Sequence, residues 1–265
     1  MSPVAGLRRR MIERCDGGPL GQARFVVGLA GVLAAVEARG ILHETLAPHM
    51  LRMPVWSFTA TWPAGAYDAV WGVWLIASVG MTVGLFTRAS CLLVTLAAGV
   101  YIQLDHQFYS NHAYLLAILA FLFTMGDAGA AYSCDALRNA RRDVPAWPVA
   151  LLKIQLSIVY AFAAISKVNM VYLSGAVLAA NMIHGPLRRF PQLVDSPEWM
   201  CAAASASILV ETALATGLWI PRWRKPLIVG GIAFHVLLII VFPANQRPGL
   251  AVFTFEMIGL YVLFR

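Results

Sequence analysis

The sequence predicts an all-α membrane protein, a polytopic bundle of about eight transmembrane helices with both termini in the cytoplasm. The chain of 265 residues is 60% hydrophobic and 12% charged, whereas a soluble domain carries about 25% charged residues. Its apolar residues form long runs, and most of its arginines gather in short segments between them, as in cytoplasmic loops. The net charge of +7 therefore indicates a membrane partner, the lipid bilayer, and not nucleic acid.

Eight apolar runs approach the roughly 20 residues that a helix needs to span a bilayer. The fourth and eighth runs are short and fit tilted or partly re-entrant helices. We expect all eight in one transmembrane domain over residues 1–265, with no separate luminal or extracellular domain. The runs are residues 23–38, 67–86, 89–104, 112–125, 147–168, 202–220, 226–242 and 250–264.

The first run follows an arginine cluster that is typical of a signal peptide. No small-residue cleavage site follows it, and it begins after a Gly-Gly-Pro segment, so we interpret it as a retained helix. Gly28 and Gly31 within it predict close packing against another helix. The four cysteines have no metal-ligand spacing, and the sequence predicts neither a metal site nor a disulfide framework. The arginines of the cluster are Arg8, Arg9, Arg10 and Arg14.

The distribution of Lys and Arg predicts the orientation of the helices. With the N-terminus inside, the outer segments hold few of these residues, and Asn111, His112 and Lys167 lie at outer helix ends. Arg24, Lys153 and Lys167 lie at helix edges and do not enter this count. The two longest outer connections, residues 39–66 and 169–201, carry His43, His49 and His184 and are expected to be functional loops. The inner cations are Arg8, Arg9, Arg10, Arg14, Arg88, Arg138, Arg141, Arg142, Arg222, Arg224, Lys225 and Arg265, and the outer ones are Arg39, Arg52, Arg188, Arg189 and Arg247.

Lys167, at the end of the fifth run, is the first candidate for chemistry. A charged amine at membrane depth costs roughly 2.5–3.5 kcal/mol, and a buried amine that loses its proton becomes a usable general base. The alternative is a helix-end lysine whose charge reaches the headgroups while its stem covers apolar surface.

Four further residues have a functional and a structural interpretation. Asn111 and His112 fit a polar pair beside Lys167 or a helix N-cap. Glu211 and His235 lie in the middle of the sixth and seventh runs, where ionisable groups are functional candidates. A hydrogen bond between them that locks the two helices is the alternative. Asp127 and Asp135 belong to an inner loop. Ion pairs with nearby arginines, which would stabilise this loop, explain their presence there.

The segment from about residue 109 to residue 167 resembles the vitamin K-dependent gamma-glutamyl carboxylase, and a weaker similarity runs from Glu37 to the C-terminus, including Phe234–His235. The order and spacing of so many positions make the resemblance to this carboxylase-like, HTTM-type membrane family specific. The matching positions are Ser110–Asn111–His112–Ala113–Tyr114–Leu115, Leu119–Ala120–Phe121, Met125–Gly126–Asp127, Ser133–Cys134–Asp135, Leu137–Arg138–Asn139–Ala140–Arg141–Arg142, Val144–Pro145–Ala146–Trp147, Gln155, Ile158–Val159–Tyr160, Ala163 and Ser166–Lys167.

The resemblance implies a role for each matching residue. Lys167 is the base that deprotonates vitamin K hydroquinone or menaquinol, and Asn111 and His112 stabilise the reacting quinone. Tyr160 and His235 belong to the quinol-binding region. Oxygenation of the quinol yields a strong base that removes a γ-proton from a glutamate side chain. Carbon dioxide then captures the carbanion, and the quinone leaves as the epoxide, so the co-substrates are O2 and CO2 and no metal is required.

The chain departs from the family pattern in two ways. It has Ser166–Lys167 where the animal enzyme has two adjacent lysines, and it ends shortly after the last run, without the large luminal portion that holds the peptide. We therefore expect a compact bacterial member in the inner (plasma) membrane, with its active site on the non-cytoplasmic side. A glutamate-containing peptide or a separate exported protein is the expected partner. The alternatives are a quinol epoxidase or oxygenase without Glu carboxylation, and a non-catalytic membrane maturation or immunity component.

Overall fold

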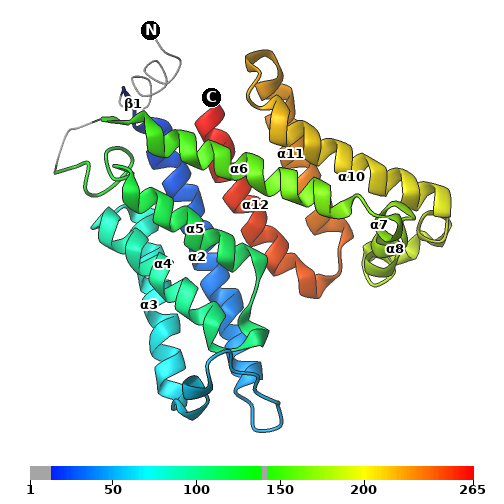
Figure 1. Cartoon of the computed structure of the whole chain (residues 1–265), viewed down its shortest axis with the longest axis horizontal. Helices are drawn as coiled ribbons and strands as arrows, with labels where there is room; N and C mark the ends of the chain where they lie inside the picture. Colours follow the sequence, from blue (N-terminus) through cyan, green and yellow to red (C-terminus); the bar gives the residue numbers. More distant parts are fainter. Residues whose placement is uncertain (1–12, 139–141) are drawn as a thin grey trace. The chain divides into compact units, whose positions relative to one another are not determined.

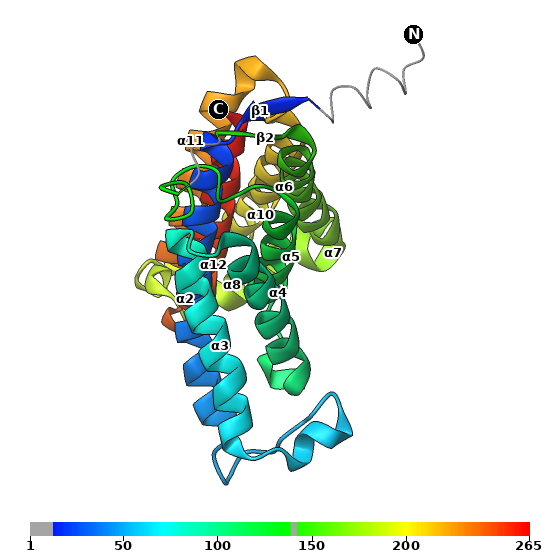
Figure 2. The ribbon, with the colours of Figure 1, turned by 90° about the vertical axis from the view of Figure 1, so that its left-hand side faces the viewer.

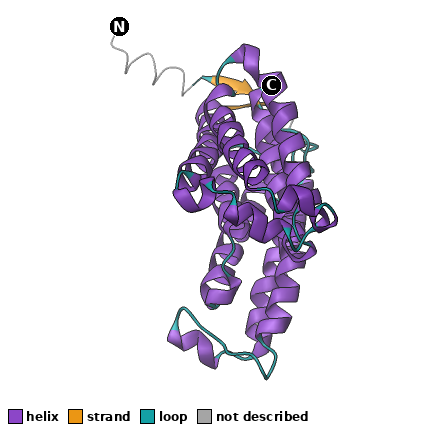
Figure 3. Cartoon of the chain, turned by 90° about the vertical axis from the view of Figure 1, so that its right-hand side faces the viewer, coloured by secondary structure: helices purple, strands orange, loops and turns teal. Residues whose placement is uncertain are grey.

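The computed structural model describes residues 13–138 and 142–265, and nearly all of its regular structure is α-helical (Figure 1). In Figure 3 the only strands drawn are a short pair, β1 (Arg14–Asp16) and β2 (Asp143–Pro145), which are antiparallel. The predicted all-α class is confirmed. Arg8, Arg9, Arg10, Asn139, Ala140 and Arg141, which entered the orientation and the resemblance, lie outside the described residues.

Seven helices in the described part of the chain are long and apolar enough to cross a membrane, so this is an integral membrane protein. The fourth predicted run forms a shorter apolar helix, α5 (Asn111–Met125). All eight predicted runs are thus helical. The seven long helices are α2 (Gly18–Thr45), α3 (Ala64–Val83), α4 (Thr87–Leu104), α6 (Ala146–Lys167), α10 (Pro197–Gly217), α11 (Pro221–Val241) and α12 (Arg247–Tyr261), the last extended by 3-10 turns at both ends.

The described chain forms two compact units, and the division falls within α6 and within α12. The first unit comprises residues 13–152 and 255–263, and the second comprises residues 153–254 and 264–265. That residues 1–265 form one domain stays a prediction. The cytoplasmic location of both termini also stays a prediction.

In the first unit, α2 and α3 lie side by side, and α4 packs against α3 and α5 (Figure 2). Gly28 and Gly31 of α2 make the contact with α3 close. A Cβ atom at Gly28 would lie 2.7 Å from Cα of Thr82, and one at Gly31 would lie 2.8 Å from Oγ of Ser78. The prediction that these glycines allow close helix packing is confirmed.

The helix α2 is longer than its apolar run, which corrects the predicted outer connection. It continues to Thr45 and therefore includes Arg39 and His43, which were expected in a loop. Arg39 forms an ion pair with Asp68 of α3, and its guanidinium lies 4.8 Å from the ring centroid of Trp71. These contacts give the polar end of α2 partners on α3, so the helix does not end where the apolar residues end.

Arg24 was expected at a helix edge but is fully buried. Its guanidinium donates hydrogen bonds to the carbonyl oxygens of Met81 and Thr82 at the end of α3, and to those of Ala128 and Tyr132 after α5. A cation is favourable at a helix C-terminus because the unpaired carbonyl groups carry partial negative charge. Arg24 thus joins α2, α3 and the following loop.

The acidic residues of this loop contact the start of α4. Asp127 forms the expected kind of ion pair, but with Arg88 (2.8 Å). Asp135 instead accepts hydrogen bonds from the N–H groups of Phe86 (3.1 Å) and Thr87 (2.7 Å) and from the Thr87 hydroxyl (2.7 Å). It therefore caps α4. Desolvation opposes ionisation of Asp135, but the hydrogen bonds from Thr87 and Phe86, with the charge of Arg138, outweigh it and lower the pKa of the carboxyl.

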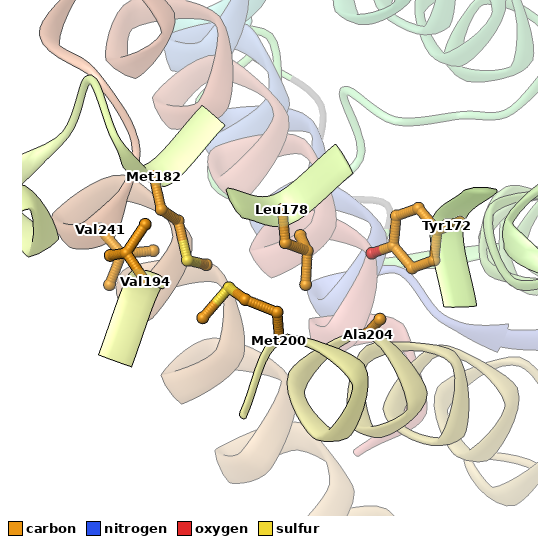
Figure 4. Packing of buried hydrophobic residues seen from close by; sticks show 7 residues of the cluster. All are labelled: Tyr172, Leu178, Met182, Val194, Met200, Ala204 and Val241. Atoms are coloured by element: carbon orange, nitrogen blue, oxygen red, sulfur yellow. The ribbon is translucent and has the colours of Figure 1, made fainter. Parts of the chain in front are cut away.

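The second unit contains three short helices between α6 and α10: α7 (Met170–Leu173), α8 (Ala176–Met182) and α9 (Pro191–Val194). The predicted outer connection 169–201 is therefore largely helical. A buried apolar cluster packs these helices against α10 and the end of α11 (Figure 4), and the Tyr172 hydroxyl points toward the side of the cluster on which Leu178 lies. The cluster consists of Tyr172, Leu178, Met182, Val194, Met200, Ala204 and Val241.

Candidate functional site

The helix α6 presents Tyr160 and Lys167 on one buried stripe. Leu156 and Tyr160 are fully or almost fully buried and Ala164 is 6% exposed, and the spacing of four and then three residues keeps Lys167 on the same face. The helix ends at Lys167 because Asn169 caps the next one. The Asn169 side chain accepts a hydrogen bond from the Tyr172 N–H (2.9 Å) and donates one to the Ser166 carbonyl (2.9 Å).

The amine of Lys167 turns into the protein. Its Nζ donates a hydrogen bond to Oε1 of Glu211 on α10, and it lies 5.7 Å from the ring centroid of Tyr172. The Lys167 side chain is 25% exposed and that of Glu211 is 6% exposed. The Tyr172 hydroxyl is itself held by Ser207 (2.8 Å), one helical turn before Glu211. The partly buried ion pair supports a specific role for Lys167 over a freely mobile helix-end anchor.

His235 of α11 pairs with Tyr160. The Tyr160 hydroxyl and His235 Nε2 are 2.6 Å apart, and both side chains are almost fully buried. The imidazole also packs against the rings of Phe234 and Phe253, with centroid distances of 5.7 Å and 5.4 Å. Tyr160, the partner of His235, lies two helical turns before Lys167 on α6. The expected structural hydrogen bond between His235 and Glu211 is therefore wrong, because each residue has a different partner on α6.

Asn111 and His112 belong to the first unit. His112 Nε2 lies 2.8 Å from Oε2 of Glu37 on α2, with side chains 15% and 17% exposed. Oδ1 of Asn111 accepts a hydrogen bond from the Tyr109 hydroxyl (3.2 Å). Neither residue is the helix cap, because Ser110 occupies that position and accepts a hydrogen bond from the Ala113 N–H (3.3 Å). His112 is thus a partnered imidazole, as Lys167 is a partnered amine.

The structure brings Lys167, Tyr160 and His235 together within the second unit, whereas Asn111 and His112 are described within the first. Sequence reasoning did not identify the partners Glu37, Tyr172 and Ser207, and it assigned the wrong partner to Glu211. Glu37 and Glu211 share one signal, an acidic residue inside an apolar run. The same signal also selects Glu256, a fully buried carboxyl with no hydrogen-bond partner among the described residues.

The second-unit cluster fits the chemistry of a quinol. The Tyr160 hydroxyl and the His235 ring nitrogen, 2.6 Å apart, suit one ring oxygen of a hydroquinone, and the rings of Phe234, Phe253 and Tyr172 suit its aromatic face. Oε2 of Glu211 is buried and has no hydrogen-bond partner in the described part of the chain. These residues would orient a lipid-soluble ring beside the amine.

A separate cavity of about 600 Å³ lies in the first unit, at the end formed by the start of α4 and the loop after α5. Its lining includes the charged residues Arg88, Asp127, Asp135 and Arg138. None of the residues predicted for the site lines it, and its charged lining does not suit an apolar quinol.

The comparison with known proteins gives one family. The HTTM domain matches residues 13–264, while no solved structure matches the chain significantly. Because the domain match covers nearly the whole chain, this protein belongs to the HTTM family, whose domain is found in vitamin K-dependent gamma-carboxylase-like proteins.

Proposed function

We propose that this protein is a quinol-dependent, carboxylase-like membrane enzyme in which Lys167 is the base. The observation that carries the proposal is the Lys167 amine, held by Glu211 two helical turns from the Tyr160–His235 pair on the same face of α6. Lys167 matches the family's base in the sequence resemblance. Tyr172 and Glu211 give the amine two fixed neighbours, which a lysine that only anchors a helix end does not require.

The quinol is vitamin K hydroquinone or menaquinol. When bound, it supplies, together with O2, the strong base that removes a glutamate γ-proton, and CO2 completes the carboxylation. Lys167 accepts the proton of a quinol hydroxyl. Tyr160 and His235 bind and orient the ring, and the apolar surroundings exclude water, which would otherwise compete for the proton.

Asn111 and His112, which lie in the first unit, are the further catalytic residues that the family resemblance implies. Oε2 of Glu37 lies 2.8 Å from Nε2 of His112, so the imidazole has a carboxylate neighbour, as catalytic histidines elsewhere do. The enzyme lies in the bacterial inner membrane with its active site on the non-cytoplasmic side. A glutamate-containing peptide or an exported partner protein supplies the group that is carboxylated.

The test uses purified protein in lipid nanodiscs with vitamin K hydroquinone, oxygen, labelled bicarbonate and a glutamate-containing peptide. We expect epoxide formation that is lost in Lys167→Ala and retained in Lys225→Ala, a control at an exposed lysine of α11. Label in the peptide identifies a carboxylase, and epoxide without label identifies a quinol epoxidase. Equal epoxide formation by the wild type and Lys167→Ala would contradict the proposal.

A further inference from the structure

The partner of Lys167 is an acidic residue for which the sequence favoured a structural role. Glu211 contributes Oε1 to the Nζ atom of Lys167, and its side chain is 6% exposed. Oε2 has no hydrogen-bond partner among the described residues. A buried carboxylate needs a compensating charge or donor, and Lys167 provides it. The charge of Glu211 is therefore tied to the protonation of a single amine.

Glu211 and Tyr172 lie next to the Lys167 amine, and the Tyr160–His235 pair lies farther along α6. Glu211 lies on α10, Tyr172 on α7 and His235 on α11, and Tyr160 on α6 is hydrogen-bonded to His235. Glu211 is the acidic group in direct contact with the amine. Its position on α10 is fixed by the turn that carries Ser207, which is bonded to Tyr172.

We propose that Glu211 is a positioning residue that stabilises the ammonium group formed when Lys167 accepts the substrate proton. This inference rests on the proposed function. The reacting form has the neutral Lys167 amine: the quinol O–H bond breaks, its electron pair stays on the oxygen, and the proton binds the lone pair of Nζ, which forms the ammonium group that pairs with Oε1 of Glu211. The new ammonium charge balances the Glu211 carboxylate as a negative charge appears on the quinol oxygen. Triad carboxylates stabilise an imidazolium in the same way.

The variant Glu211→Gln tests this role because it keeps the size and one acceptor oxygen but removes the charge. The first readout does not depend on turnover. The chain has three lysines, Lys153, Lys167 and Lys225, so mass spectrometry resolves the acylation of each by a membrane-permeable succinimide ester. Only an unprotonated amine is acylated. We expect the acylation profile of Lys167 to move to lower pH by about one unit in Glu211→Gln, while Lys153 and Lys225 keep theirs.

The second readout is epoxide formation as a function of pH. We expect the plateau rate of Glu211→Gln to fall about tenfold, as for other partners of catalytic groups, and the acidic limb to move to lower pH in parallel with acylation. Glu211→Asp keeps the carboxyl and is expected between the wild type and Glu211→Gln; it supplies the same test if the glutamine variant does not fold. Ser157→Ala is the matched control, because it removes a hydrogen bond between α6 and Trp219 (2.8 Å) away from Lys167.

The two readouts separate the possible failures. If the wild type forms no epoxide, the proposed function fails, and acylation still tests the pair. If the Lys167 acylation profile is the same in the wild type and in the Glu211 variants that fold, the role of Glu211 is overturned. A merely structural Glu211 would lower the amount of folded protein and leave both pH profiles unchanged.

Discussion

Replacing Tyr160 with phenylalanine removes one hydroxyl from the candidate quinol site and leaves the ring in place. That hydroxyl lies 2.6 Å from His235 Nε2, and the two side chains are 1% and 2% exposed. A buried hydrogen bond contributes about 0.5–1.5 kcal/mol net, and an unsatisfied buried partner costs about 1–3 kcal/mol. Since 1.4 kcal/mol corresponds to about tenfold in an equilibrium constant, we expect the KM for quinol to rise about fivefold to tenfold.

The assay is steady-state epoxide formation in nanodiscs over a range of quinol concentrations. Because Lys167 and Glu211 are unchanged in Tyr160→Phe, kcat should change less than about twofold. Tyr132→Phe, which removes the hydroxyl of an exposed tyrosine, is the control. If Tyr160 acts through His235, Tyr160→Phe should have little further effect in a His235→Leu background. A folded Tyr160→Phe protein with an unchanged KM, or full additivity of the two substitutions, would refute this reasoning.

Three further predictions concern stability, measured by thermal unfolding in detergent. Gly28→Ala should destabilise by about 1–3 kcal/mol because the new Cβ meets the backbone of Thr82, whereas Gly72→Ala on α3, with no atom within 4 Å, should be neutral or stabilising; equal effects would contradict the close α2–α3 contact. Arg24→Met should cost about 3 kcal/mol or more, since several carbonyl groups lose their donor; a wild-type melting temperature would contradict this. Asp135→Asn should destabilise at pH 7, and the difference should disappear in acid. The lowered pKa of the Asp135 carboxyl means that its stabilisation is present above the ordinary carboxyl range, near pH 4, and is lost as the pH falls through the folded-state value. A difference independent of pH would show that charge does not contribute.

The helices could be predicted from the sequence because a bilayer imposes a length and a composition on each of them. Their ends could not, since they depend on contacts between elements. The helix α2 continues past its apolar residues where Arg39 meets Asp68. Arg24 stands next to the start of the first apolar run, which predicts a helix edge, but four carbonyl groups from other segments surround it.

The residues of the candidate site could be predicted from the sequence, but their hydrogen-bond partners could not. Lys167, Tyr160 and His235 were identified from their positions in apolar runs and from the family resemblance. Glu211 and His235 were paired with each other in the structural alternative, although they contact Lys167 and Tyr160 respectively. Helices that are apolar on all sides lack the amphipathic pattern that sets which face turns inward. The sequence therefore did not predict which faces of α10 and α11 are buried, and so it did not predict which residues they contact on α6.

The most direct test of the central claim is a single turnover of vitamin K hydroquinone with ¹⁸O₂, followed by mass spectrometry of the quinone products. If Lys167 is the base, wild-type protein and Lys225→Ala form epoxide that carries ¹⁸O, and Lys167→Ala forms none. Simple autoxidation to quinone should be equal in all three samples. Labelled epoxide from Lys167→Ala at the wild-type level, or none from the wild type, would contradict the account.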